Sequence, residues 1–297
     1  MSAIDEIKSH VPDVIKFLKG KGIDERYLQF GGEDPAPEKQ PRAPTDARSE
    51  FLANRAMGDW AENILTDKFN KSSLFKVAHY GNSETIAAGE PGFKEYYISA
   101  LEEVRKFGKR PDLLVFAKNS DVPHNLSSVA VPDSDKYVQL SKAAIEVRSS
   151  KFEAQTYMRV RQQDKGDGKA AANETPSFTV KVEDLRIVYR WIERHNISQS
   201  YCQVFFDCVY AINVKKIFKI IASGKNLKVD NPIKSQMKTT IMIPITSGEL
   251  VGRFDSLPKF EVENKVTRLG RHDAFVKPVG GELILDEAKL MSVLLES

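Results

Sequence analysis

Two runs of apolar residues place the strongest limit on what this chain can fold into. DLLVFA at 112–117 is apolar throughout after its aspartate, and YCQVFFDCVYAI at 201–212 is apolar at both odd and even positions. A strand with one face in water alternates apolar with polar residues, whereas a strand covered on both faces does not. We therefore expect both runs to be buried strands, the second a single central strand, in a sheet with layers on both sides.

The segments around these runs predict helices in alternation with strands. Apolar residues recur at helical spacing in 3–19, 48–69 and 182–192, with Ser2 as the expected cap of the first helix. Residues 74–81 and 143–147 have the pattern of further strands, while 94–108 fits either a helix or a long strand. The polar segments 120–135 and 162–177 are expected to be loops. This order predicts an α/β fold with a central mixed β-sheet flanked by helices.

Three parts of the chain are expected. Residues 1–47 hold the first helix and a proline-rich connector, residues 48–224 form the α/β core, and residues 225–297 form a β-rich C-terminal extension packed on the core. Short β-like runs in the extension, such as TTIMIPI at 239–245, either continue the central sheet or form a small added β region.

Composition limits the class of protein. The 297 residues are 41% hydrophobic, enough for a sizeable core, and 44 basic against 41 acidic residues leave a net charge of only +3. Contact with a polyanion must therefore come from local clusters of cations. The two cysteines, Cys202 and Cys208, have neither zinc-type spacing nor a disulfide framework, so buried free thiols are expected. Without a long uncharged apolar segment, the protein is expected to be soluble and cytoplasmic.

Two carboxylates predict a metal site in the core. Asp112 opens one buried strand and Glu146 lies within the next expected strand. Carboxylates that meet in a cleft repel one another unless a cation lies between them, and hard oxygen ligands suit Mg²⁺. Residues two apart on a strand share a face, so Arg148 should lie beside Glu146 and stabilise a negatively charged transition state. Such a site fits the hydrolysis of a phosphodiester.

These residues resemble the PD-(D/E)XK nuclease superfamily. PD at 111–112 is followed by EVR at 146–148, with arginine where lysine is usual, and AIEVRSSKFEAQTYMRV resembles the same segment of type II restriction endonucleases, in particular those of the AccI type. The superfamily resemblance covers roughly residues 50–215. It implies a restriction-endonuclease-like core and a third carboxylate, matched in position by Glu62, from the preceding helix. Because arginine does not lose its proton, the deprotonation of water by the usual lysine cannot be transferred to Arg148.

The resemblance implies a magnesium-dependent enzyme that cuts double-stranded DNA at a specific short, palindromic site. A two-fold symmetric site favours a homodimer, and a DNA methyltransferase of the same specificity is expected in the same prokaryotic cell. The residues expected to contact DNA combine cations with hydrogen-bonding side chains in three segments, 157–169, 234–240 and 268–273. With the residues that follow the catalytic strand, they are Ser149, Ser150, Lys151, Arg159, Arg161, Lys165, Lys234, Lys238, Arg268 and Arg271.

Simpler interpretations remain beside these. A proline and aspartate before an apolar run often only begin a strand, Glu62 fits a solvated helix face, and Ser149 and Ser150 could merely end a strand. Lys151 has the wrong parity to replace the missing lysine unless the strand bulges. Two other functions are also open: a repair or recombination nuclease of low specificity, and a DNA-binding protein that has lost catalysis.

Overall fold

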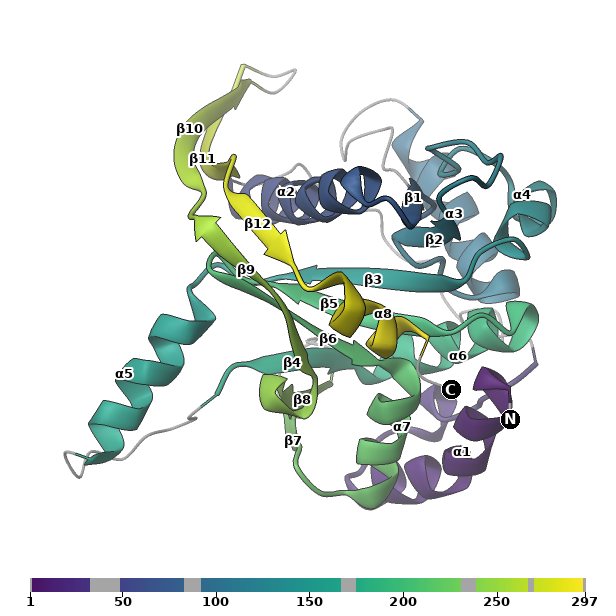
Figure 1. Ribbon diagram of the computed structural model, residues 1–297. Helices are drawn as coiled ribbons and strands as arrows, with labels where there is room; N and C mark the ends of the chain where they lie inside the picture. The colour runs from purple at the N-terminus through teal and green to yellow at the C-terminus, as the bar shows by residue number, and fades with distance from the viewer. Residues whose placement is uncertain are drawn as a thin grey trace.

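A seven-stranded mixed sheet forms the centre of the computed structural model (Figure 1), which describes residues 2–32, 49–82, 92–166, 175–230, 239–266 and 270–295. The strand order is β1-β2-β3-β5-β6-β9-β12, with only β3 and β5 parallel. The strands are β1 (Phe75–His79), β2 (Leu113–Ala117), β3 (Ala143–Ser149), β5 (Gln199–Val204), β6 (Cys208–Asn213), β9 (Glu249–Ser256) and β12 (Glu282–Leu285).

Two smaller sheets complete the β structure. A three-stranded sheet has the order β4-β8-β7, and a two-stranded ribbon pairs β10 with β11. These strands are β4 (Ser177–Lys181), β7 (Lys228–Asp230), β8 (Thr240–Pro244), β10 (Lys259–Val266) and β11 (His272–Val279).

Helices cover both faces of the large sheet. The α-helices are α1 (Ala3–Gly20), α2 (Ser49–Lys71), α3 (Phe93–Phe107), α4 (Val131–Val138), α5 (Ala154–Gly166), α6 (Val182–His195), α7 (Val214–Ser223) and α8 (Glu287–Leu294), with short 3-10 turns at Glu25–Tyr27 and Ile245–Ser247. One core lies between the sheet and α2 with α8, and the other between the sheet and α1, α6 and α7. None of the described helices is long and apolar enough to cross a membrane.

The two cores explain the apolar runs. In β2, Leu113 and Val115 face the α2 side while Leu114 and Phe116 face the α6 side, and all four are fully buried. The predicted α/β fold with a mixed sheet and flanking helices is therefore confirmed. Both cysteines are buried free thiols, as expected.

Four local predictions need correction or completion. The run at 201–212 is not one strand: β5 and β6 form an antiparallel hairpin, and its tight turn is covered by aromatic packing, including the Phe152 and Phe205 rings 5.2 Å apart. Part of the expected loop at 120–135 belongs to α4, which has a proline in its first turn. The ambiguous segment at 94–108 is helical, and α5 continues to Gly166 within the expected loop at 162–177.

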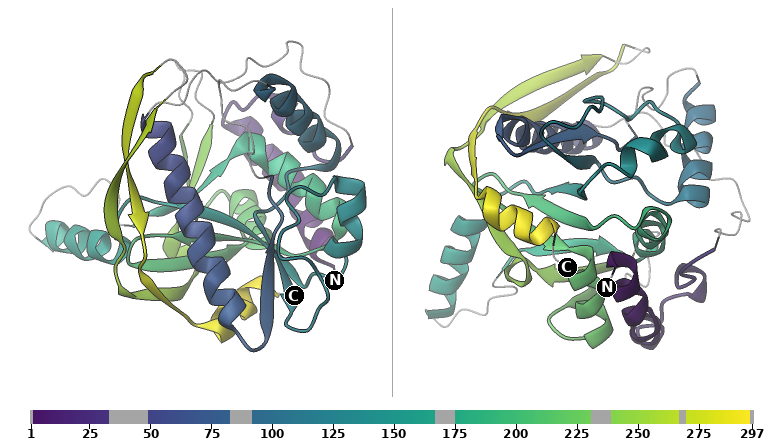
Figure 2. Two further views of the ribbon diagram at one scale, coloured as in Figure 1. Left: turned by 90° about the horizontal axis from the view of Figure 1, so that it is seen from above. Right: turned by 45° about the vertical axis from the view of Figure 1, so that its right-hand side comes forward.

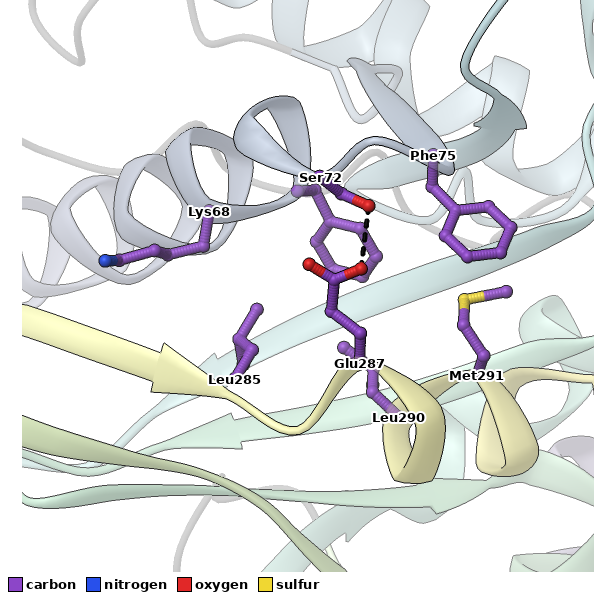
Figure 3. A pocket seen from close by; sticks show the side chains of 8 residues that line it. Lys68, Ser72, Phe75, Leu285, Glu287, Leu290 and Met291 are labelled. Atoms are coloured by element: carbon purple, nitrogen blue, oxygen red, sulfur yellow. Dashed lines mark hydrogen bonds between the residues drawn. The ribbon is translucent and has the colours of Figure 1, made fainter.

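The C-terminal strands both continue the central sheet and form an added β region, the two alternatives that the sequence left open. β9 and β12 extend the large sheet, and beyond them the same hairpin continues as the ribbon β10–β11 alongside α2 (Figure 1). The Trp60 indole on α2 donates to the Gly280 carbonyl over 2.9 Å. Just after the last residue of α2, Ser72 Oγ donates to Glu287 Oε2 of α8 over 2.8 Å, beside Phe75 and Met291 (Figure 3). The C-terminal segment therefore contacts α2 at its middle and just beyond its last residue.

Candidate active site

Asp112 and Glu146 come together at the edge where the β2–β3 pairing stops. The register pairs Leu113 with Ile145, so Asp112 stands one position outside the ladder. Its carboxylate replaces the next backbone bond, because Asp112 Oδ2 accepts from the Val147 amide over 2.6 Å. The aspartate side chain therefore lies against the strand that carries Glu146.

The main chain of Asp112 is fixed from the other side. Its carbonyl oxygen accepts from the Tyr80 amide over 2.8 Å and from the Gly81 amide over 3.1 Å. A Cβ at Gly81 would lie 3.1 Å from both the Cα and Oδ1 of Asp112. The chain after β1 therefore presses directly on the aspartate, and glycine permits this approach.

Glu146 is almost completely buried between two cations. The residue is 2% exposed, and its Oε1 contacts the Lys109 amine and, over 3.1 Å, the Arg148 guanidinium. Its other oxygen, Oε2, is buried and has no hydrogen-bond partner within the described part of the chain. Because a buried carboxylate oxygen without a partner is costly, it marks a place where a cation would fit.

Arg148 is held in place by contacts with three side chains. Besides Glu146, its guanidinium contacts Asp184 of α6 over 3.5 Å and lies 5.5 Å from the centre of the Tyr201 ring. Burial opposes a charge here, but the combined effect of Glu146, Tyr201, Asp184 and Asp112 outweighs it and raises the pKa of Arg148. Glu146 and Arg148 do share a face of β3, and the arginine stays charged beside the glutamate.

Lys109 is the site residue that the sequence reasoning missed. Burial alone would lower the pKa of its amine, but the carboxylates of Glu146 and Asp112 outweigh burial and raise it, so the amine stays protonated. Its backbone amide donates to the Ile187 carbonyl of α6 over 3.0 Å. The signal in the sequence was a cation three residues before Asp112, in GKRPD.

Gly108 explains how Lys109 reaches the site. It has a φ of +88°, and a Cβ at this position would lie 2.5 Å from the Trp191 amide nitrogen of α6. Only glycine tolerates both the positive φ and the contact between backbones. The end of α3 is thereby pressed onto α6, and the next residue points its side chain towards Glu146.

Burial makes the carboxylates costly without a counter-ion. It raises the pKa of Asp112 well above its usual range, and the neighbouring Glu146 carboxylate raises it further, against the effect of Lys109. Hard oxygen ligands in such a place match Mg²⁺ or a similar divalent ion. A bound cation would therefore provide a partner for the buried Glu146 Oε2 and offset the buried charge of Asp112.

Glu62 lies near Asp112 and Glu146 but does not form a set of three metal ligands with them. Glu146 shares parity with Ala144, which faces the α6 side, whereas α2 covers the opposite face of β3. Burial, followed by the carboxylates of Asp59 and Glu146, raises the pKa of Glu62 to about 7. No group of three His, Cys, Asp or Glu able to share one ion occurs among the described residues, so Glu62 is a neighbour of the pair in this conformation.

The residues after β3 run from the site towards the surface. Ser149 ends the strand, and Ser150 Oγ accepts from the Gln203 amide over 2.9 Å. Lys151 is exposed and lies beyond the end of β3. The lysine that contacts Glu146 is Lys109. Arg159, Arg161 and Lys165 all lie on α5.

The two C-terminal segments expected to contact DNA are only partly described. Lys234, Lys238 and Arg268 lie outside the described residues. Arg271, at the start of the return strand of the ribbon, is ion-paired with Asp273 over 2.8 Å.

A comparison with protein families decides the identity of the chain. The model of the family described as AccI restriction endonuclease matches residues 26–176 and 169–296. The chain belongs to the AccI restriction endonuclease family. It is thus a type II restriction endonuclease, a hydrolase whose substrate is DNA. No curated protein and no solved structure matches the chain. The resemblance found in the PD and EVR segments is confirmed, and the match also includes the C-terminal strands that this resemblance did not cover.

Proposed function

We propose that this AccI-family enzyme cleaves double-stranded DNA at a specific short palindromic site, using Mg²⁺ held by Asp112 and Glu146. The observation that carries the proposal is the buried Glu146 Oε2, which has no hydrogen-bond partner among the described residues and lies beside a second buried carboxylate. When bound, the ion supplies Lewis-acid chemistry: it promotes ionisation of a water and offsets charge on the phosphate. Glu62 is proposed as a third carboxylate that joins when the ion is present.

Three other groups of the chain are proposed to position the carboxylates and the phosphate. The Val147 amide holds the Asp112 carboxylate in one orientation towards Glu146. Arg148, fixed by Asp184 and the Tyr201 ring, orients Glu146 and keeps one oxygen occupied. Lys109, with its side chain 28% exposed, can reach outward and offset charge on the scissile phosphate.

The wider setting follows from a two-fold symmetric substrate. Two copies related by a two-fold axis would place one active site on each strand, so a homodimer is proposed. A nuclease of this kind needs its own genome protected, which places a DNA methyltransferase of the same specificity beside it in a prokaryotic cytoplasm. Ser149, Ser150, Lys151, Arg159, Arg161, Lys165, Lys234, Lys238, Arg268 and Arg271 are proposed to contact the DNA.

Digestion of a plasmid tests the proposal. Discrete fragments should form with magnesium or manganese and none with an excess of chelator, and sequencing of the fragment ends gives the site and the cut position. Undiminished cleavage in chelator contradicts the metal site. A smear indicates a nuclease of low specificity, and retarded but uncut DNA with magnesium present indicates a protein that only binds.

A further inference from the structure

The helix α5 stands apart from the rest of the molecule. Figures 1 and 2 show it extending away from the sheet in every view. Ala154, at its first position, is its only buried residue within the described structure. An isolated helix of this length is marginal in water, because most helical stability in proteins comes from tertiary packing. A helix presented in this way is suited to a partner outside the chain.

The first turn of α5 is nevertheless firmly anchored. Asp207, in the turn between β5 and β6, accepts from the amides of Ala154 and Gln155, each over 2.8 Å, and so caps the helix from another part of the chain. The Gln155 side chain donates to the Tyr210 hydroxyl over 3.0 Å. The direction of α5 is therefore fixed relative to β5, which pairs with the strand that carries Glu146.

The exposed face of α5 has a definite chemistry. Arg159, Gln162 and Gln163 are exposed and follow the i, i+3, i+4 spacing that places residues on one helix face. Arg161 lies on another side, over the Tyr157 ring at 5.3 Å and 3.4 Å from Asp164. This face thus combines one cation with two amides. Val160, 45% exposed on the neighbouring side of the helix, is a single apolar residue and not the apolar stripe that a protein partner requires.

We infer that α5 enters the major groove of the bound duplex and reads base edges through Arg159, Gln162 and Gln163. This inference rests on the site-specific cleavage proposed above. Arginine pairs through two hydrogen bonds with the major-groove edge of guanine, and glutamine does the same with adenine. An α-helix about 10–12 Å across fits a groove about 12 Å wide, and 13 residues extend over about 20 Å. The face carries a cation and two amides on a helix that begins eight residues after Glu146, so it matches DNA in charge and follows the strand of the candidate site directly.

Binding measurements with the full-length protein test this inference. The site found by plasmid mapping is placed in one duplex, and a second duplex has the same composition in scrambled order. Affinity for each is measured by fluorescence anisotropy in chelator, so that cleavage does not interfere. The variants are Arg159→Ala, Gln162→Ala and Gln163→Ala, with Lys16→Ala on the exposed surface of α1 as a control that removes the same charge far from α5.

The expected result is a loss of specificity. Arg159→Ala and at least one glutamine variant should weaken binding to the site duplex about 10- to 100-fold, while binding to the scrambled duplex changes much less. Lys16→Ala should change neither. Site duplexes with 7-deazapurines lack the N7 acceptor of the major groove. The parent protein should bind them more weakly than the unmodified site duplex, whereas the affinity of the variants should fall little further.

Other outcomes overturn the inference. An equal loss on both duplexes assigns α5 to the phosphate backbone alone, and unchanged affinities remove it from the interface. A change in molecular mass by size-exclusion chromatography, without a change in DNA affinity, assigns the helix to a contact between protein chains. If the parent enzyme gives discrete fragments and the α5 variants keep full site preference, only this inference fails. A smear from the parent contradicts the proposed function as well.

Discussion

Glu62 gives the sharpest test of how the carboxylates depend on a cation. Burial, followed by Asp59 and Glu146, raises its pKa from 4.5 to about 7 in the folded protein. Replacing Glu62 with glutamine keeps the shape of the side chain and removes its charge. We expect the Glu62→Gln variant to be more stable than the parent at alkaline pH in the absence of metal.

The size and direction of the effect follow from the raised pKa. A shift from 4.5 to about 7 corresponds to roughly 3 kcal/mol for a group shielded from water. The Glu62 side chain is 32% exposed, so solvent screening reduces the expected value to about 1–2 kcal/mol. Because the folded state binds the proton more tightly, the contribution of Glu62 is complete below pH 4.5 and is lost as the pH rises through about 7.

Urea unfolding in chelator, followed by circular dichroism across this pH range, measures the effect. The free-energy difference between the parent and the Glu62→Gln variant should be near zero at the acid end and reach its full value above pH 7. The control is Glu102→Gln, which makes the same chemical change at an exposed position of α3. A difference that does not vary with pH, or one that the control reproduces, refutes the reasoning.

Magnesium should reverse the pattern if Glu62 joins the site. A bound cation favours the charged carboxylate, so millimolar magnesium should stabilise the parent increasingly as the pH rises, and the Glu62→Gln variant less so. Thermal unfolding with and without magnesium measures this difference. Equal stabilisation of parent and variant at every pH removes Glu62 from the set of metal ligands.

Three further perturbations have defined outcomes. Asp112→Asn and Glu146→Gln should each slow single-turnover plasmid cleavage at least about a hundredfold while duplex binding persists; cleavage at the parent rate would reduce Asp112 to a strand entrance. Lys109→Ala and Arg148→Ala should both lose most of the cleavage rate, whereas Arg148→Lys should retain part; an active Lys109→Ala variant would show that its amine serves only the fold. Gly108→Ala should lower the free energy of unfolding by about 2 kcal/mol in urea, because a Cβ cannot fit against α6, and unchanged stability would contradict that packing.

The paired carboxylates could be predicted from the sequence because their positions depend on strand geometry. An aspartate at the entrance of one buried strand and a glutamate within its neighbour need only adjacent strands to come near each other, and the period of two then fixes the face of Arg148. Lys109 could not be found in this way. It lies between a helix and a strand, and its direction depends on Gly108 packing against α6, which is distant in sequence.

The hairpin at 201–212 and the helix α5 show the same division. Residues of β5 and β6 are buried on both faces, as the pattern indicated. The turn at Phe205–Asp207 carries none of the usual glycine or proline, so the sequence pattern does not distinguish one strand from two. The cap of α5 is Asp207, which lies more than fifty residues after the helix begins and is invisible to a search for local capping residues.

Local pattern by itself therefore determined the class of fold, the buried strands and the paired carboxylates of the candidate site. These properties follow from the period of a strand or helix and from the burial of apolar side chains, which neighbouring residues in the chain specify. Tertiary packing alone decided that Lys109 meets Glu146, that Glu62 of α2 lies near the pair, and that α5 projects as a free-standing helix. Each of these depends on contacts between segments far apart in sequence, which no local pattern encodes.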